Sequence, residues 1–142
     1  MAVLEFKNYS VEEINYKKNG LYKNNKNGIN LIPKIKVKNN FDDDKIMVTI
    51  TINIGSLDNE NSPFTLNVSV TGDFVYHSEE DRDDVGVDTL VHKNAVAILF
   101  PYVRTVVSSI TKESNDYPAL ILPTINVAQV LAEQENSSEI SD

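Results

Sequence analysis

A long segment of helix-spaced apolar residues constrains the fold of this chain more than any other feature. Val91, Ala95, Ile98 and Tyr102 follow one another at spacings of four, three and four, and apolar residues continue at similar spacing to Ile110. This period is close to the 3.6 residues of a helical turn, so the segment predicts one long helix. It also contains Pro101, which lacks a backbone donor and clashes with the preceding turn. We therefore expect a kink or a break there.

The predicted helix is apolar on more than one side. A helix of this kind is usually buried on several sides. A small sheet covers only one of them, so we expect a second subunit to cover another. The residues predicted at this interface between subunits are Ile98, Tyr102, Val106, Val107 and Ile110.

The first half of the chain favours β structure. Every second residue from Ile46 to Ile54 is apolar, and the residues between them are mostly polar. The same alternation predicts strands over roughly 3–17, around 31–38 and over 64–76. It slips at residues 9–11, which suggests a β-bulge. Pro33 suits an edge position for the second strand, because it cannot donate to a neighbouring strand.

These elements predict an α+β fold. Short connections between alternating segments indicate a four-stranded antiparallel sheet of the meander type. The long kinked helix would follow, and then a short helix from Val127, capped by Asn126 with Gln129. We expect helices on one face of the sheet. Residues 1–132 would form one domain, followed by a mobile acidic tail over 133–142.

Composition excludes several classes of function. The net charge of the 142 residues is −8, which argues against nucleic-acid binding, because phosphates need a basic surface. The chain has no cysteine, so disulfides and thiolate chemistry are excluded. The first seven residues do not resemble a signal peptide. No apolar segment reaches the length of about 18 residues that marks a membrane span. We therefore expect a cytoplasmic protein without membrane insertion.

No group of residues predicts catalysis. His77 and His92 do not have the spacing of metal ligands. The acidic clusters at 42–44 and 79–81 lack the glycine and distal glutamate of a calcium loop, and solvated turns explain them better. There is no glycine-rich phosphate loop. We expect a protein that is not an enzyme and that has no cofactor and no metal.

A second apolar segment, Pro-Ala-Leu-Ile-Leu-Pro at 118–123, is enclosed by two prolines. A peripheral segment cannot bury both of its sides within one small subunit. Leu120 and Leu122 could pack under the helix while Ile121 meets a neighbouring subunit. Alternatively, the segment could line an apolar groove that holds an extended, unfolded chain through apolar contacts and backbone hydrogen bonds. Both interpretations remain open.

These two segments together resemble the SecB family of export chaperones. Residues 98–104 read Ile-Leu-Phe-Pro-Tyr-Val-Arg, where the family has Ile-Leu-Phe-Pro-Tyr-Ala-Arg. Residues 120–126 read Leu-Ile-Leu-Pro-Thr-Ile-Asn and are similar to the family's proline-containing segment before its last helix. The resemblance implies a cytoplasmic homotetramer, built as a dimer of dimers. It also implies a chaperone that holds unfolded polypeptides without ATP and prevents their aggregation.

The resemblance also implies which residues contact clients. By position, the client-binding groove would contain Ile35, Val37, Leu122, Ile125, Val130 and Leu131. The crossover loop between the first two strands would add Leu21, Tyr22 and Leu31.

One departure concerns the export motor SecA, which docks on an acidic sheet face in the family. Glu13 keeps one of the acidic positions, but Lys17 and Asn67 replace two others. Because charges at the rim of an interface govern docking rate and specificity, we expect SecA binding to be weak. Three hypotheses remain: a general holdase, an interaction protein dedicated to one partner such as an antitoxin, and a small enzyme. No site can be named for the enzyme.

Overall fold

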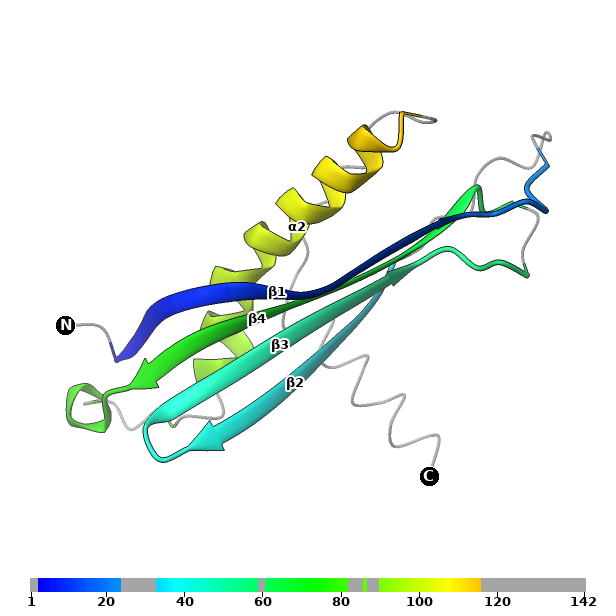
Figure 1. Ribbon diagram of the computed structural model, residues 1–142. Helices are drawn as coiled ribbons and strands as arrows, with labels where there is room; N and C mark the ends of the chain where they lie inside the picture. The colour runs from blue at the N-terminus through cyan, green and yellow to red at the C-terminus, as the bar shows by residue number, and fades with distance from the viewer. Residues whose placement is uncertain (1–2, 24–32, 59–60, 82–85, 87–89, 116–142) are drawn as a thin grey trace, which may run out of the picture.

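The computed structural model describes residues 3–23, 33–58, 61–81, 86 and 90–115. Within them, four strands form one antiparallel sheet, and a helix lies across one of its faces (Figure 1). The strands are β1 (Leu4–Lys18), β2 (Lys34–Asp42), β3 (Lys45–Ile54) and β4 (Phe64–Tyr76). A 3-10 turn η1 (Ser78–Glu80), a π-helical turn η2 (Val91–Ala95) and the helix α2 (Val96–Glu113) follow. The predicted α+β class is confirmed.

The strand order is β1-β4-β3-β2. Only β2, β3 and β4 follow one another as a meander. The predicted full meander would place β1 beside β2, whereas β1 pairs with β4 at the opposite edge. The turn at residues 43–44 is so short that β2 and β3 must be neighbours, whereas the connection over 19–33 is long enough to cross the sheet. β2 is therefore an edge strand, as Pro33 predicted.

β1 contains two bulges, where the alternation in the sequence indicated one. Its register with β4 shifts between Phe6 and Asn8 and again between Val11 and Glu13. Each bulge adds one unpaired residue and thereby resets which side chains face each side of the sheet. As a result, the apolar residues of β1 share their side of the sheet with the buried side chains of β4. These residues are Leu4, Phe6, Tyr9, Val11, Ile14 and Tyr16.

The core lies between the sheet and α2. It contains the apolar stripes of β3 and β4, and from α2 it takes Val96, Leu99, Phe100, Val103 and Val107. Gly72 lets the helix approach β4 closely. A Cβ atom at this position would lie 2.9 Å from the Phe74 side chain and 3.0 Å from that of Leu99. We call the side of the sheet that faces α2 the helix side, and the opposite side the outer face.

α2 is continuous through Pro101, so of the kink or break predicted there the break does not occur. Pro101 cannot hydrogen-bond the carbonyl of Ala97, but both residues lie on the exposed side of the helix. Water can hydrogen-bond that carbonyl there, which lowers the cost of the proline. The departure from α-helical geometry is the π-helical turn η2, immediately before α2. The predicted short helix from Val127 and the predicted acidic tail lie outside the described residues.

Candidate functional site

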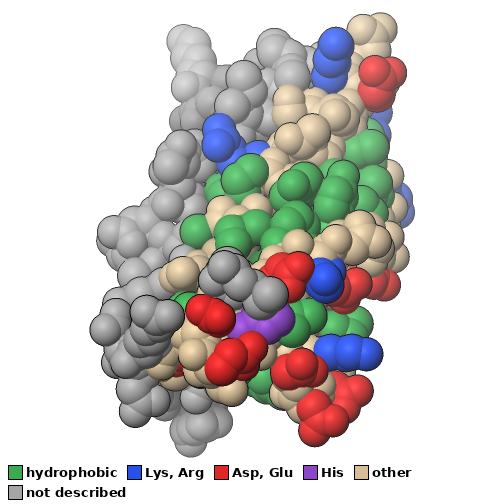
Figure 2. Space-filling model, turned by 90° about the vertical axis from the view of Figure 1, so that its left-hand side faces the viewer, with side chains coloured by type: hydrophobic (Ala, Val, Ile, Leu, Met, Phe, Trp, Pro, Cys, Tyr) green, Lys and Arg blue, Asp and Glu red, His purple; other side chains and the backbone are tan. Residues whose placement is uncertain are grey.

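An apolar patch lies where β1 meets α2. Figure 2 shows apolar side chains gathered on this side of the molecule, above a region where acidic side chains are interspersed with basic ones and a histidine. The patch is formed by exposed large apolar residues of the two elements, namely Tyr9, Val11, Ile14, Ile98 and Tyr102. The Tyr9 and Tyr102 rings are 4.3 Å apart, and Phe6 lies 5.6 Å from Tyr102. These ring contacts join the two elements into one surface.

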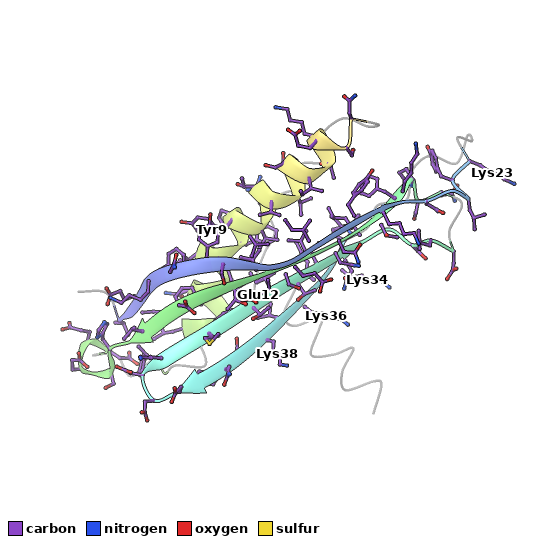
Figure 3. The ribbon with its side chains drawn as sticks, viewed as in Figure 1. Tyr9, Glu12, Lys23, Lys34, Lys36 and Lys38 are labelled. Atoms are coloured by element: carbon purple, nitrogen blue, oxygen red, sulfur yellow. The ribbon has the colours of Figure 1, made fainter. Side chains whose placement is uncertain are left out.

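The bulges of β1 create this patch. Without the extra residue at Lys7, Tyr9 would fall on the outer face, because side chains alternate along a strand. Tyr9 lies opposite Gly72, which has no side chain of its own on the helix side. The ring of Tyr9 can therefore lie near α2, as Figure 3 shows. Sequence analysis did not identify Tyr9; the break in alternation at residues 9–11 was the available signal.

The five residues predicted at the subunit interface differ in exposure. Ile98 and Tyr102 are 37% and 36% exposed and are available to another subunit. Val106 and Ile110 are half-buried against the core. Val107 is fully buried within the single chain. The role of all five at an interface stays a prediction.

Two of the predicted groove residues, Ile35 and Val37, lie on the helix side of β2. Both are half-buried and pack against the core. The other four, Leu122, Ile125, Val130 and Leu131, lie outside the described residues. The groove as a whole therefore stays a prediction.

Of the crossover-loop residues predicted to contact clients, Leu21 is 64% exposed and Tyr22 is half-buried. Leu31 lies outside the described residues. A buried residue that sequence analysis missed, Asn19, fixes the start of this loop. Its Nδ2 donates to the carbonyls of Ser56 and Ser62 at 3.3 and 2.8 Å, and its Oδ1 accepts from the Leu21 amide at 3.0 Å. Asn19 thus holds the exposed Leu21 beside the turn that precedes β4.

The outer face is rich in hydroxyl and amide groups. Thr49 hydrogen-bonds Thr71 at 2.8 Å, and Thr51 hydrogen-bonds Ser69 at 3.0 Å, both between β3 and β4. Glu13 is exposed and lies opposite Ser69 in the register, so it belongs to this face. By the same register, Lys17 and Asn67 belong to it as well. The three positions that the resemblance connects with SecA therefore share one face, and only one of them is acidic.

A histidine joins the start of β1 to the end of β4. The Nε2 of His77 lies 2.9 Å from Glu5 Oε2, and its Nδ1 lies 3.5 Å from Glu79 Oε1. The hydrogen bond to Glu5 raises the pKa of His77 above its ordinary value of 6.5. The same hydrogen bond, with help from Lys7, lowers the pKa of Glu5 below its ordinary value of 4.5.

This pair predicts a stability that depends on pH. The stabilisation by His77 is complete below pH 6.5 and is lost as the pH rises through the folded-state pKa of His77. The stabilisation by Glu5 is complete above pH 4.5 and is lost as the pH falls through the folded-state pKa of Glu5. The pair should therefore stabilise the fold most between these two values. Melting temperatures from pH 5 to 9 should fall more steeply above pH 6.5 for the unmodified protein than for His77→Gln. Parallel curves would contradict this role.

The described residues contain no cluster of three or more histidine, cysteine, aspartate or glutamate residues that could hold a metal ion. In the same part of the chain, no helix is long and apolar enough to cross a membrane. The described residues do present exposed apolar surface. Such surface can bind another chain but cannot activate a nucleophile or transfer a proton.

Two known proteins are similar to this chain in sequence. The chain is 36% identical over 142 residues to an uncharacterised protein of Methanocaldococcus jannaschii, covering 97% of this chain and 88% of the relative. It is 26% identical over 99 residues to the protein-export protein SecB of Psychrobacter cryohalolentis, covering 70% of this chain and 63% of that protein.

Two solved structures share the fold. One is the Mycobacterium tuberculosis SecB-like chaperone in complex with a ChAD peptide from the HigA1 antitoxin, with a TM-score of 0.67 and 16% identity, covering 86% of this chain and 90% of that one. The other is a protein of unknown function from Streptococcus agalactiae, with a TM-score of 0.55 and 14% identity, covering 85% and 97%. At these identities the likeness concerns the fold alone.

The family model described as preprotein translocase subunit SecB matches residues 3–138. This range includes all four strands, α2 and both segments on which the resemblance was based. The chaperones of this family are not enzymes, in keeping with a chain for which no catalytic group could be named. The chain belongs to the SecB family.

Proposed function

We propose that this chain is an ATP-independent holdase of the cytoplasm, which binds unfolded polypeptides and prevents their aggregation. Its membership in the SecB family supports this function. The observation that carries it is apolar surface outside the proposed subunit interface: Ile35 and Val37 of β2 keep part of their surface exposed, and Leu21 in the loop after β1 is 64% exposed. Exposed apolar surface of this kind commonly binds other chains.

The proposed assembly is a homotetramer, built as a dimer of dimers. Ile98 and Tyr102 support it, because they lie on the side of α2 that the chain's own sheet leaves exposed. Tyr9 extends the same surface through its ring contact with Tyr102. Burial of this patch between subunits would remove apolar area from water, which is the main driving force of stable association.

The proposed client surface lies at the other edge of the helix side. Ile35 and Val37 of β2 would form its sheet wall, and both retain some exposure. Leu122, Ile125, Val130 and Leu131 would complete the groove. Leu21 and Tyr22 would add contacts from the crossover loop, where Leu21 is well exposed. Contacts of this kind are mainly apolar, so binding should tolerate many client sequences.

A second candidate function is service to a single partner, such as an antitoxin. The Mycobacterium tuberculosis SecB-like chaperone in the comparison holds a peptide from an antitoxin. In addition, Lys17 and Asn67 remove two negative charges that the family uses to dock SecA. We propose that SecA binding is weak in this chain, so that export of preproteins is not its main task.

Aggregation assays distinguish these two functions. Three unrelated proteins are diluted from denaturant with and without the chaperone, and light scattering is followed. We expect suppression of all three at a near-stoichiometric ratio, without nucleotide. Suppression of only one client would favour the dedicated function. No suppression of any client would contradict the holdase.

A further inference from the structure

A row of three lysines follows the outer face of β2. Lys34, Lys36 and Lys38 occupy alternate positions, all exposed, and Figure 3 shows them one after another along the strand. Their register partners on β3 are Asn53, Thr51 and Thr49, none of which is charged. Within the described part of the chain, no ion pair involves these lysines. A chain with a net charge of −8 thus presents an unbalanced basic row.

A pocket lies at the end of this row, two residues beyond Lys38. It has a volume of about 370 Å³, and its apolar floor contains Met47 and Val75. Met47 is 46% exposed, so an incoming side chain can contact it directly. Asn40 and Asp73 lie opposite Met47 in the register and flank the pocket from either side.

The charges around this outer pocket balance one another. Asp42 and Asp73 contribute two negative charges to its lining, and Lys7 and Lys45 contribute two positive ones. The pocket therefore favours an uncharged apolar group, whereas the row beside it favours carboxylates. Its volume lies within the range of pockets that hold small ligands or single anchor side chains.

We propose that the outer face of β2 and β3 docks an extended acidic segment of a partner protein with a bulky apolar residue at one end. Alternate residues of an extended chain are about 7 Å apart, so alternate carboxylates can meet successive lysines of the row. The apolar residue enters the outer pocket and supplies most of the affinity. The lysines orient the segment and accelerate its approach, because exposed ion pairs contribute little individually.

This site is separate from the proposed client groove. The row and the pocket lie on the outer face, whereas Ile35 and Val37 face the helix side of the same strand. A partner on the outer face can therefore bind while a client is held. The proposed partner segment is acidic, so it differs in charge from a basic partner that would dock on an acidic sheet face. Nucleic acid, although also anionic, would be repelled by a chain whose net charge is −8.

The test uses a labelled heptapeptide in which three glutamates alternate with serines and a phenylalanine stands at one end, made in both orders. Its affinity is measured by fluorescence anisotropy at low salt. We expect Lys34→Gln with Lys36→Gln and Lys38→Gln to weaken binding about tenfold, since three exposed pairs are lost. Met47→Asp in the protein, or serine for phenylalanine in the peptide, should weaken binding about tenfold or more. Added salt should weaken binding of the original peptide.

A matched control carries the same charge change elsewhere, as Lys18→Gln with Lys23→Gln and Lys112→Gln, and should bind the peptide like the unmodified protein. If it weakens binding equally, net charge is responsible and the site is wrong. Equal binding of the phenylalanine and serine peptides would also overturn the proposal. If the three lysines of the row serve only to keep the edge strand β2 from pairing with other chains, their replacement should cause aggregation and leave peptide affinity unchanged. That result would also overturn the proposal. Aggregation suppression should survive all these substitutions, so failure here leaves the holdase untouched.

Discussion

Replacement of Val107 by aspartate should unfold the chain. Val107 is fully buried between α2 and the sheet within a single subunit. An uncompensated buried charge costs about 3–5 kcal/mol, and the lost apolar contacts add to this. Typical domains are stable by about 5–15 kcal/mol, so most of the stability would be lost. Circular dichroism with thermal melting is the measurement.

The matched control places the same charge on the exposed side of the helix. Ile98→Asp should keep the secondary structure and lower the melting temperature little, because exposed substitutions usually change stability by about 0.5 kcal/mol or less. The effect of Ile98→Asp should appear in the assembly: the proposed tetramer should dissociate, which light scattering at micromolar concentration detects. A folded Val107→Asp variant would contradict the place of Val107 in the core of the subunit. An Ile98→Asp variant that remains tetrameric would contradict the place of Ile98 at the interface between subunits. A stable monomer of the unmodified protein would contradict the tetramer itself.

The double substitution Ile125→Ser with Leu131→Ser should nearly abolish client binding while leaving the tetramer intact. Each buried leucine or isoleucine contributes about 1.5–3 kcal/mol. The loss of two such contacts corresponds to about a hundredfold weaker binding or more. A single substitution should weaken it modestly, because client contacts are spread over several residues. Binding of an unfolded, labelled client is measured by anisotropy, with light scattering in parallel.

Two comparisons sharpen this test. Ile140→Ser removes an apolar side chain from the acidic tail, outside the predicted groove, and should bind clients normally. Client affinity should change little between low and high salt, in contrast to peptide binding on the outer face. Unchanged client affinity of the double variant in an intact tetramer would mean that the groove lies elsewhere or that the protein is not a holdase.

The sequence by itself determined the class of fold and the family. Alternation over residues 46–54 and 64–76 predicted β3 and β4 because both strands bury one complete side, so that every second residue must be apolar. The helix-spaced apolar residues over 91–110 predicted the helical segment of η2 and α2, and four of them, Val91, Ala95, Val103 and Val107, are buried. The motif at 98–104 identified the family. All of these signals are local: each depends on residues a few positions apart.

Only the tertiary structure decided which strands are neighbours. β1 pairs with β4 although β2 is next in sequence, because the connection at 19–33 is long enough to allow either arrangement. The second bulge of β1 was equally invisible, since its position depends on the register with β4. The apolar patch depends on the strand pairing and on the bulges. Tyr9 contacts Tyr102 only because β1 lies beside β4 and because the bulge at Lys7 turns Tyr9 to the helix side.

Tertiary structure also decided which of the predicted interface residues are exposed in a single subunit. In the sequence, Val107 and Ile98 are equivalent members of one apolar helix. The sheet covers one side of α2 completely, so that Val107 is buried while Ile98 remains exposed. The lysine row and the outer pocket were hidden in the same way, because Met47 and Lys38 become neighbours in space only through the pairing of β2 with β3. Hydrophobic periodicity reports that a side chain is buried, whereas its neighbours depend on how distant segments pack.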